Sequence, residues 1–184
     1  MVVSRIFDRI SVEEYLEAEN DGEHRHEYVY GEIYAMAGAS VPHNLINVNI
    51  TTLFKLASKG TKCRVYASDM KVRVDEEIFY YPDVIVTCQD IADTYYENNP
   101  CVIVEVISKS TARNDLLEKR LAYTKMESLQ LYLLVDSRKR WVKGFRRVGS
   151  QWQEMTVIKD QPIEIPCIDT EMTLEQIYEG TDLT

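Results

Sequence analysis

The sequence predicts a single α/β domain over residues 1–184, with a mixed β-sheet flanked by helices. Residues 101–107 form an apolar run with little alternation, which is typical of a central strand. A helical pattern over 112–126 follows this run, and a second apolar strand is expected over 129–135. A strand, a helix and a further strand in this order indicate a crossover connection within a mixed sheet.

An N-terminal helix and β-hairpin, about residues 11–38, are expected to precede this core. Ser11 begins a capping box, which predicts a helix to about Ala18. Strands over 26–30 and 32–36 then meet in a turn near Gly31. The other expected elements are a helix from Ser40 to Gly60, strands over 62–74 and 79–86, a polar hairpin near Lys143-Gly144, extended chain over 151–165 and a last helix from Thr173 to about Gly180.

The composition favours a cytoplasmic protein that does not enter a membrane. The first ten residues lack the apolar core of a signal peptide, and no apolar run approaches the ~20 residues of a membrane span. The four cysteines show no C-x-x-C spacing, so reduced thiols are expected. A zinc site is not expected either, since the three histidines show no ligand spacing with the cysteines.

The formal net charge of −9 argues against a protein coated in nucleic acid, but the charge is unevenly distributed. Residues 101–147 contain 11 basic and 5 acidic residues, a balance of +6. Within this stretch, segment 138–147 interleaves aromatic side chains with six basic residues, namely Arg138, Lys139, Arg140, Lys143, Arg146 and Arg147. They could follow a phosphate backbone, or they could protect the edge of a hairpin from aggregation.

Two carboxylates in apolar strands are the first candidates for a functional site. Asp83 follows Pro82 at the start of one strand, and Glu105 lies inside the central strand. If these strands are neighbours, both carboxylates can converge on one Mg²⁺ or Mn²⁺ ion. The alternatives are a backbone-bonded turn aspartate and a glutamate in a buried structural ion pair.

Lys119 is the third candidate. At helical spacing it shares the apolar side of its helix with Ala122, Tyr123 and Met126, the side that should pack on the sheet. An ammonium beside two carboxylates could hold a phosphate or a polarised water. An ordinary helical ion pair with Asp115 is the alternative.

These residues resemble the PD-(D/E)xK nuclease superfamily, and within it the Uma-two family of restriction-endonuclease-like proteins. The resemblance extends from about Glu27 to Asp136. It is carried by Gly31 to His43, Tyr81-Pro82-Asp83-Val84, Ile103 to Thr111, Asp115 to Lys119, Tyr123 and Leu131 to Asp136.

The resemblance implies a restriction-endonuclease-like core and Mg²⁺- or Mn²⁺-dependent hydrolysis of DNA by a homodimer. Asp83 and Glu105 would hold the metal, and Lys119 would complete the catalytic set. The superfamily's lysine normally stands two residues after the glutamate, where this chain has Ile107, so Lys119 is the natural replacement.

Two residues of the N-terminal signature are possible additions to the site. Glu32 could supply a further carboxylate or face solvent from its hairpin, and His43 could be catalytic or a satisfied core histidine. Two other functions stay open, namely an inactive nuclease-fold scaffold for binding or regulation and a metal-dependent hydrolase of small phosphates.

Overall fold

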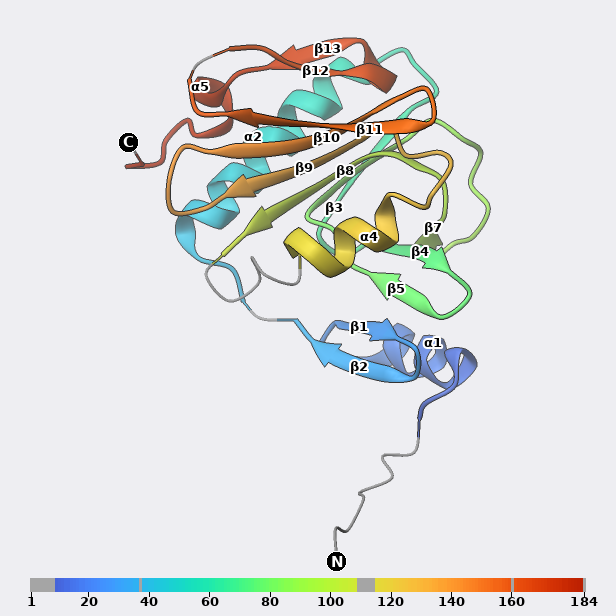
Figure 1. Ribbon diagram of the computed structural model, residues 1–184. Helices are drawn as coiled ribbons and strands as arrows, with labels where there is room; N and C mark the ends of the chain where they lie inside the picture. Colours follow the sequence, from blue (N-terminus) through green and yellow to red (C-terminus); the bar gives the residue numbers. More distant parts are fainter. Residues whose placement is uncertain (1–8, 37, 109–114, 160, 184) are drawn as a thin grey trace, which may run out of the picture.

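The computed structural model describes residues 9–36, 38–108, 115–159 and 161–183, and it confirms a mixed α/β fold built on two larger sheets (Figure 1). The six-stranded sheet has the order β11-β10-β9-β8-β6-β3. Its strands are β3 (Arg64–Ala67), β6 (Val84–Thr87), β8 (Pro100–Ile107), β9 (Leu131–Asp136), β10 (Val142–Val148) and β11 (Gln151–Val157). As predicted, β8 is central and buried throughout, and it pairs in parallel with β9.

The five-stranded sheet has the order β2-β1-β5-β4-β7 and carries the N-terminal hairpin on one side. Its strands are β1 (His26–Val29), β2 (Glu32–Ala35), β4 (Lys71–Asp75), β5 (Ile78–Tyr80) and β7 (Tyr96–Glu97). The predicted hairpin turn is present: Tyr30 and Gly31 both have positive φ, and a Cβ on Gly31 would lie 2.7 Å from the Cβ of Arg9. Glycine therefore suits this turn both in backbone conformation and in space.

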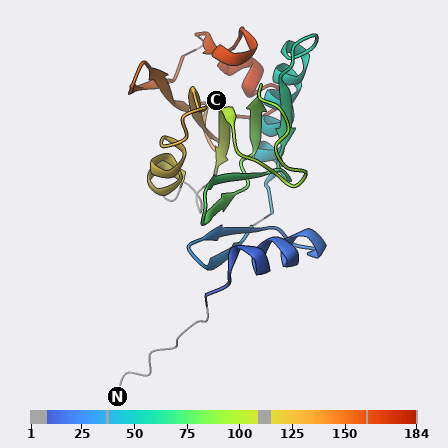
Figure 2. The same cartoon turned by 90° about the vertical axis from the view of Figure 1, so that its right-hand side faces the viewer.

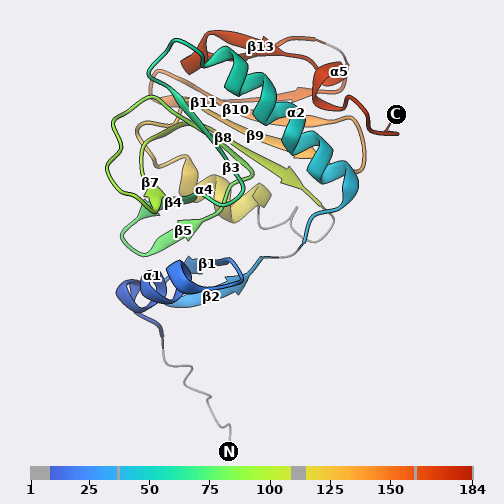
Figure 3. The same cartoon turned by 180° about the vertical axis from the view of Figure 1, so that it is seen from behind.

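Helices cover both faces of the six-stranded sheet. The long helix α2 (Val41–Ala57) packs on one face, as seen from behind in Figure 3, and its Ile46, Ile50 and Phe54 join a core cluster with β6, β8 and β9. On the other face lie a π-helical turn, η1 (Asp115–Lys119), and the short helix α4 (Arg120–Tyr123). Figure 2 shows helix α1 (Val12–Asp21) beside the hairpin, which forms one edge of the five-stranded sheet, below this body.

The C-terminal segment completes the first of these two faces. It contains a 3₁₀ turn, η2 (Pro166–Ile168), between β12 (Ile163–Ile165) and β13 (Thr170–Met172), and then helix α5 (Leu174–Ile177). Capping boxes start both α1, at Ser11, and α5, at Thr173. No helix among the described residues is long and apolar enough to cross a membrane.

Two predicted strands are wrong in extent, because each is divided between the two sheets. The expected strand over 62–74 breaks at Ser68, which has a left-handed φ of 57°, into β3 and β4. The expected strand over 79–86 breaks at Tyr81-Pro82-Asp83 into β5 and β6. Proline cannot donate to a strand ladder, so the chain leaves one sheet at this point and enters the other.

Two further boundaries differ from the prediction. The described helical residues after β8 run from Asp115 to Tyr123, while the expected start at 112 lies outside the described residues. Lys143-Gly144 lies inside β10 and not in a hairpin turn. Gly144 faces Met155 on β11, and a Cβ added there would lie 2.4 Å from the Met155 methyl carbon, so glycine provides room for that side chain.

The prediction of free thiols is also wrong for this structure. Cys63 is joined to Cys88 and Cys101 to Cys167 by disulfide bonds. Sequence spacing cannot show this arrangement, because strand register creates it: Arg64 pairs with Thr87, which places Cys63 opposite Cys88.

Candidate metal and phosphate site

Three ionisable side chains, Glu27, Glu105 and Lys119, meet where the two sheets adjoin, and a fourth, Asp83, lies at the start of the neighbouring strand. Antiparallel pairing of Val84 with Val104 brings Asp83, at the start of β6, beside Glu105 on β8. Lys119 reaches toward Glu105 from the end of η1, and Glu27 approaches from β1 in the other sheet. Lys119 and Glu105 thus form the buried ion pair that the sequence left open as an alternative, and the structure adds Glu27 to it; a metal ion shared by Glu105 and Asp83 stays a prediction.

Lys119 lies between two carboxylates. Its Nζ is 2.7 Å from Oε1 of Glu27 and 3.1 Å from Oε1 of Glu105. The side chains of Lys119 and Glu105 are only 10% and 5% exposed. The side chain of Asp115, the alternative partner expected for Lys119, lies outside the described part of the chain. A buried ammonium held by two carboxylates is fixed in position, because any displacement leaves a charge without compensation.

The hydroxyl of Tyr123 fixes Glu105 from the same side. Tyr123 lies one helical turn beyond Lys119 and donates a hydrogen bond of 3.0 Å to Oε1 of Glu105. Burial, reinforced by the charges of Glu105 and Glu27, raises the pKa of Tyr123 well above its ordinary value. The phenol therefore stays protonated and serves as a donor to the carboxylate.

Glu27 is anchored to the chain that enters β6. Its Oε1 accepts a hydrogen bond of 3.3 Å from the backbone N–H of Tyr81. The ammonium of Lys119 also lies 5.3 Å from the ring centroid of Tyr80, within cation–π range. Burial raises the pKa of Tyr80 to about 12, so this ring stays neutral beside the ammonium.

Asp83 is held by a separate set of contacts. Its Oδ2 accepts a 2.7 Å hydrogen bond from the backbone N–H of Val106, and its Oδ1 accepts a 3.3 Å bond from Nδ2 of Asn47. Nε2 of His43, at the start of α2, lies 3.4 Å from the same Oδ1. The structure thus places His43 beside Asp83, where a protonated imidazole would form an ion pair.

The side chains here offer oxygen donors of the kind that a hard divalent cation prefers, although in the described part of the chain they do not form a closely spaced set of three ligands. Glu27, Glu105 and Asp83 supply carboxylate oxygens, the ligand type that Mg²⁺ and Mn²⁺ favour. Glu27 and Glu105 share the single ammonium of Lys119, so carboxylates outnumber cations in this group. Asp83 adds a further carboxylate, held partly by the uncharged donors Asn47 and Val106. A divalent ion would offset this excess.

Glu32 lies elsewhere. It is exposed on β2, and its carboxylate accepts a 2.6 Å hydrogen bond from the hydroxyl of Tyr34. Glu27, which sequence reasoning missed, is the hairpin glutamate that reaches the lysine. Its local sequence gave no signal, because the groups that contact its carboxylate are the backbone N–H of Tyr81, between β5 and β6, and the ammonium of Lys119, at the end of η1.

The basic residues of segment 138–147 are divided between two ends of the sheet. The turn between β9 and β10 carries Arg138, Lys139 and Arg140 beyond Ile107, at the end of β8 where Glu105 lies. Arg146 and Arg147 lie at the opposite end of the sheet, because Arg146 pairs with Leu131 at the start of β9.

Several of these side chains are already engaged within the molecule. Arg138 pairs with Asp136 at 2.7 Å, Lys143 with Glu154 at 2.7 Å, and Arg146 with Glu164 at 3.2 Å. Arg147 donates to the backbone carbonyls of residues 124, 126 and 129. In the turn, Lys139 and Arg140 also lie near aromatic rings, 5.4 Å from that of Trp141 and 6.0 Å from that of Tyr178, so structural contacts engage the turn as well.

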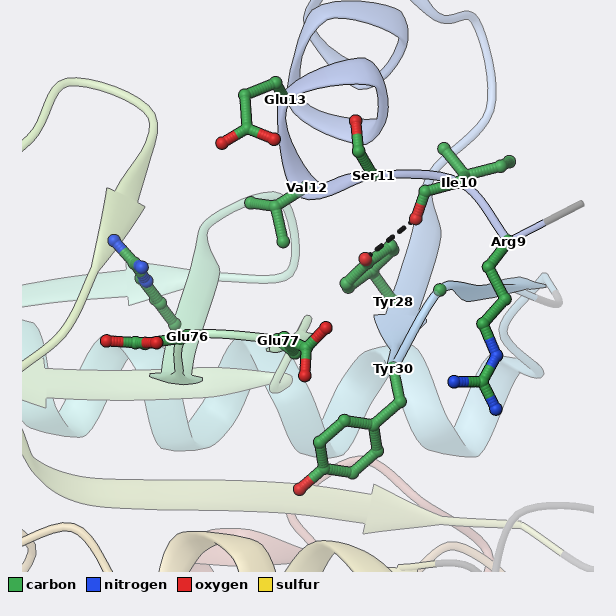
Figure 4. A pocket seen from close by; sticks show the side chains of 11 residues that line it. Arg9, Ile10, Ser11, Val12, Glu13, Tyr28, Tyr30, Glu76 and Glu77 are labelled. Atoms are coloured by element: carbon green, nitrogen blue, oxygen red, sulfur yellow. Dashed lines mark hydrogen bonds between the residues drawn. The ribbon is translucent and has the colours of Figure 1, made fainter.

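A groove elsewhere on the molecule is separate from this cluster. It lies between the start of α1, the β1–β2 turn and the β4–β5 turn, and Figure 4 shows Arg9, Glu76 and Glu77 on its walls. The hydroxyl of Tyr28 closes one side by donating a 2.9 Å hydrogen bond to the carbonyl of Ile10. Asp83, Glu105 and Lys119 are not among the residues that line it.

Comparisons with known proteins agree with this architecture. Two uncharacterized proteins of Synechocystis sp. are 34% and 32% identical to the chain, covering 95% and 85% of it and 94% and 91% of their own lengths. The crystal structure of a protein from Anabaena variabilis, titled "a putative nuclease belonging to DUF820", superposes with a TM-score of 0.77 at 16% identity. That match covers 92% of this chain and 97% of the other, and it supports the fold. The profile of the Uma2 family, described as "Putative restriction endonuclease", matches residues 12–175, so the chain belongs to the Uma2 family.

Proposed function

We propose that this chain is an endonuclease that hydrolyses DNA phosphodiester bonds with Mg²⁺ or Mn²⁺. The observation that carries the proposal is the buried pair of Lys119 and Glu105, with the lysine only 10% exposed, next to Asp83 at the start of the adjacent strand β6. Membership of a family described as "Putative restriction endonuclease" supports the same chemistry.

In this proposal each side chain has a defined task. Asp83 and Glu105 bind the divalent ion, which when bound supplies an activated water and neutralises charge in the transition state. The Val106 N–H orients Asp83, and Tyr123 orients Glu105. Lys119 holds a non-bridging phosphate oxygen or the attacking hydroxide by its positive charge.

Glu27 is the residue that keeps the Lys119 ammonium in place. At 2.7 Å it makes the shorter of the two carboxylate contacts with Lys119. When Glu105 engages a metal, Glu27 still compensates the ammonium, so the lysine stays charged and oriented toward the phosphate.

DNA would approach the end of the sheet where the Arg138–Arg140 turn lies. Positive charge there can attract the phosphate backbone to the acidic cluster, which the net charge of −9 otherwise opposes. We further propose that the protein acts as a cytoplasmic homodimer. Exposed apolar side chains on and beside the edge strand β2, Ile33, Tyr34 and Met36, offer a surface that a second copy could cover.

Nicking of supercoiled plasmid tests the proposal. The purified chain is incubated with Mg²⁺ or Mn²⁺, with an EDTA control, beside Glu105→Gln and the matched variant Glu118→Gln, which removes an exposed carboxylate next to Lys119. Nicking is expected to require metal, to fall at least 100-fold in Glu105→Gln and to be unchanged in Glu118→Gln. Nicking that survives the Glu105 change would refute the site.

The same samples separate the two alternative functions. A small-phosphate hydrolase would cleave a model phosphodiester such as bis(p-nitrophenyl) phosphate and leave plasmid intact. An inactive scaffold would cleave neither, while plasmid binding measured by gel shift would persist.

A further inference from the structure

The four cysteines, far apart in sequence, meet at one place in the fold. Cys63 precedes β3, Cys88 follows β6 and Cys101 lies at the start of β8, so three adjacent strands present them at the same end of the sheet. Cys167 is brought there by the 3₁₀ turn η2 of the C-terminal segment. This is the opposite end of these strands from Asp83 and Glu105, so the cluster is distinct from the proposed nuclease site.

The sulfur atoms are closer together than two independent disulfides require. Sγ of Cys88 lies 3.8 Å from Sγ of Cys101, across the two bonded pairs. The sulfurs of Cys88, Cys101 and Cys167 all lie within 4.8 Å of one another, and Cys63 is bonded to Cys88. In a tetrahedral site with Zn–S bonds of about 2.3 Å, neighbouring sulfurs are about 3.8 Å apart. The sulfurs of Cys88 and Cys101 already have this spacing, and opening the two disulfides would separate the bonded pairs toward it.

We propose that the reduced protein binds one Zn²⁺ ion through the thiolates of Cys63, Cys88, Cys101 and Cys167. The disulfide-bonded arrangement is the oxidised form of the same site. Two equivalents of a dithiol supply four electrons and four protons to open both disulfides, and the dithiol is oxidised to its own disulfide. Zn²⁺ then displaces the four thiol protons and forms a tetrathiolate of charge −2.

The surroundings suit a closed structural site. All four cysteines belong to the apolar cluster beneath α2 and the C-terminal segment, and Cys101 is 6% exposed. The other three are partly exposed, which gives an ion a path of entry. The guanidinium of Arg64 donates to the carbonyl of Gln89, directly after Cys88, and this positive charge offsets part of the charge of the tetrathiolate.

The compact spacing favours a single ion over an iron–sulfur cluster. An iron–sulfur cluster places several iron and sulfide atoms between its cysteines, so it requires a wider set of thiolates. Zinc also resolves a conflict with the proposed cytoplasmic location, where disulfides are reduced. Reduction would otherwise detach Cys167 from the sheet, whereas a zinc ion keeps η2 joined to β3, β6 and β8.

Metal analysis of the reduced protein tests the proposal. The full chain is prepared with a dithiol and equilibrated with Zn²⁺, and free metal is removed before elemental analysis. One zinc per chain is expected in the wild type and in Asp83→Ala/Glu105→Ala, which retains all four cysteines. The Cys101→Ser/Cys167→Ser variant should retain less than a tenth of that zinc. Because this variant could fail to fold, Co²⁺ is also added to the reduced wild type, where strong sulfur-to-metal charge-transfer absorption of tetrahedral geometry is expected.

Oxidation provides the complementary measurement. A disulfide oxidant should release the zinc and yield Cys63–Cys88 and Cys101–Cys167 peptides in a non-reducing digest. Reduced wild type that binds no zinc and gives no cobalt charge-transfer bands would overturn the proposal, as would iron in place of zinc. Because the metal is measured directly, these outcomes do not depend on whether the protein cleaves DNA.

Discussion

Replacing Lys119 with methionine tests whether the lysine is the charge centre of the site. The substitution keeps a long apolar stem but removes the ammonium that lies 2.7 Å from Glu27 and 3.1 Å from Glu105. The two carboxylates, 18% and 5% exposed, would then face each other without a cation. Loss of one partner of a buried ion pair costs about 3–5 kcal/mol. Since a domain of this kind is stable by about 5–15 kcal/mol, the variant should fold but with much reduced stability.

Urea denaturation followed by tryptophan fluorescence measures this loss. Both tryptophans, Trp141 and Trp152, pack against the core cluster that contains Tyr123, so their emission reports on this part of the molecule. The midpoint should fall with little change in slope. The matched control is Lys125→Met, which removes an exposed lysine just after α4 and should cost less than about 0.5 kcal/mol.

Mg²⁺ provides a second measurement on the same variant. If the carboxylates bind the ion, Mg²⁺ should restore part of the lost stability, by about 2.7 kcal/mol at 100 times its dissociation constant. The wild type should gain less, because Lys119 already compensates the same charges. A loss below about 1 kcal/mol in Lys119→Met would place the pair among weak surface ion pairs and refute this reasoning.

Three further predictions concern Asp83, Asp136 and Arg147. Asp83→Ala leaves the N–H of Val106 without its side-chain acceptor, so it should cost about 1–3 kcal/mol in urea and abolish Mg²⁺ binding in calorimetry; undiminished binding would remove Asp83 from the metal site. Burial by itself raises the pKa of Asp136, but the hydrogen bonds and the positive charge of Arg138 outweigh this effect and hold the pKa below its usual value. The stability that the ionised carboxylate adds is therefore present above its pKa in the unfolded chain and is lost as the pH falls through its pKa in the folded protein. The loss of unfolding free energy in Asp136→Asn should therefore become smaller in acid, and a loss that does not change with pH would contradict this argument. Arg147→Ala removes donors to three backbone carbonyls and should cost about 2 kcal/mol in urea, with DNA affinity by gel shift unchanged; weakened DNA binding would return Arg147 to the nucleic-acid surface.

The parts of the site that sequence could predict depend on local periodicity. Helical spacing correctly predicted that Lys119 lies on the buried side of its helix, whereas the convergence of Asp83 and Glu105 on one ion, expected from strand alternation, stays a prediction. Glu27 could not be found in this way, since its partner Lys119 lies far along the chain and in contact with the other sheet. The cysteine cluster escaped prediction for the same reason, because only strand register and the fold of the C-terminal segment bring its members together.

The second sheet was missed although its signals were present. The sequence pattern predicts one strand through Tyr81-Pro82-Asp83, yet proline marks the point where the ladder ends. The break has a structural consequence, because it places Asp83 at the crossing from one sheet to the other. The backbone N–H of Tyr81, two residues earlier, bonds Glu27, while Asp83 itself accepts from Val106. A short irregular segment thus connects the glutamate of one sheet to the carboxylates of the other.

The apolar residue at position 107 follows from the same geometry. Ile107 shares the face of β8 with Glu105, is 2% exposed and packs in the core cluster that contains Ala122 and Tyr123. A lysine at this position would have to place its charge in that apolar cluster, at a high desolvation cost. Lys119 instead reaches the Glu105 carboxylate from the helix that covers this face, passing the ring of Tyr80. The strand position is then free for packing, and the position of the ammonium depends on how η1 and α4 dock on the sheet. Changes that loosen this docking, even at residues that touch no substrate, should therefore weaken the site through Lys119 before they affect Asp83.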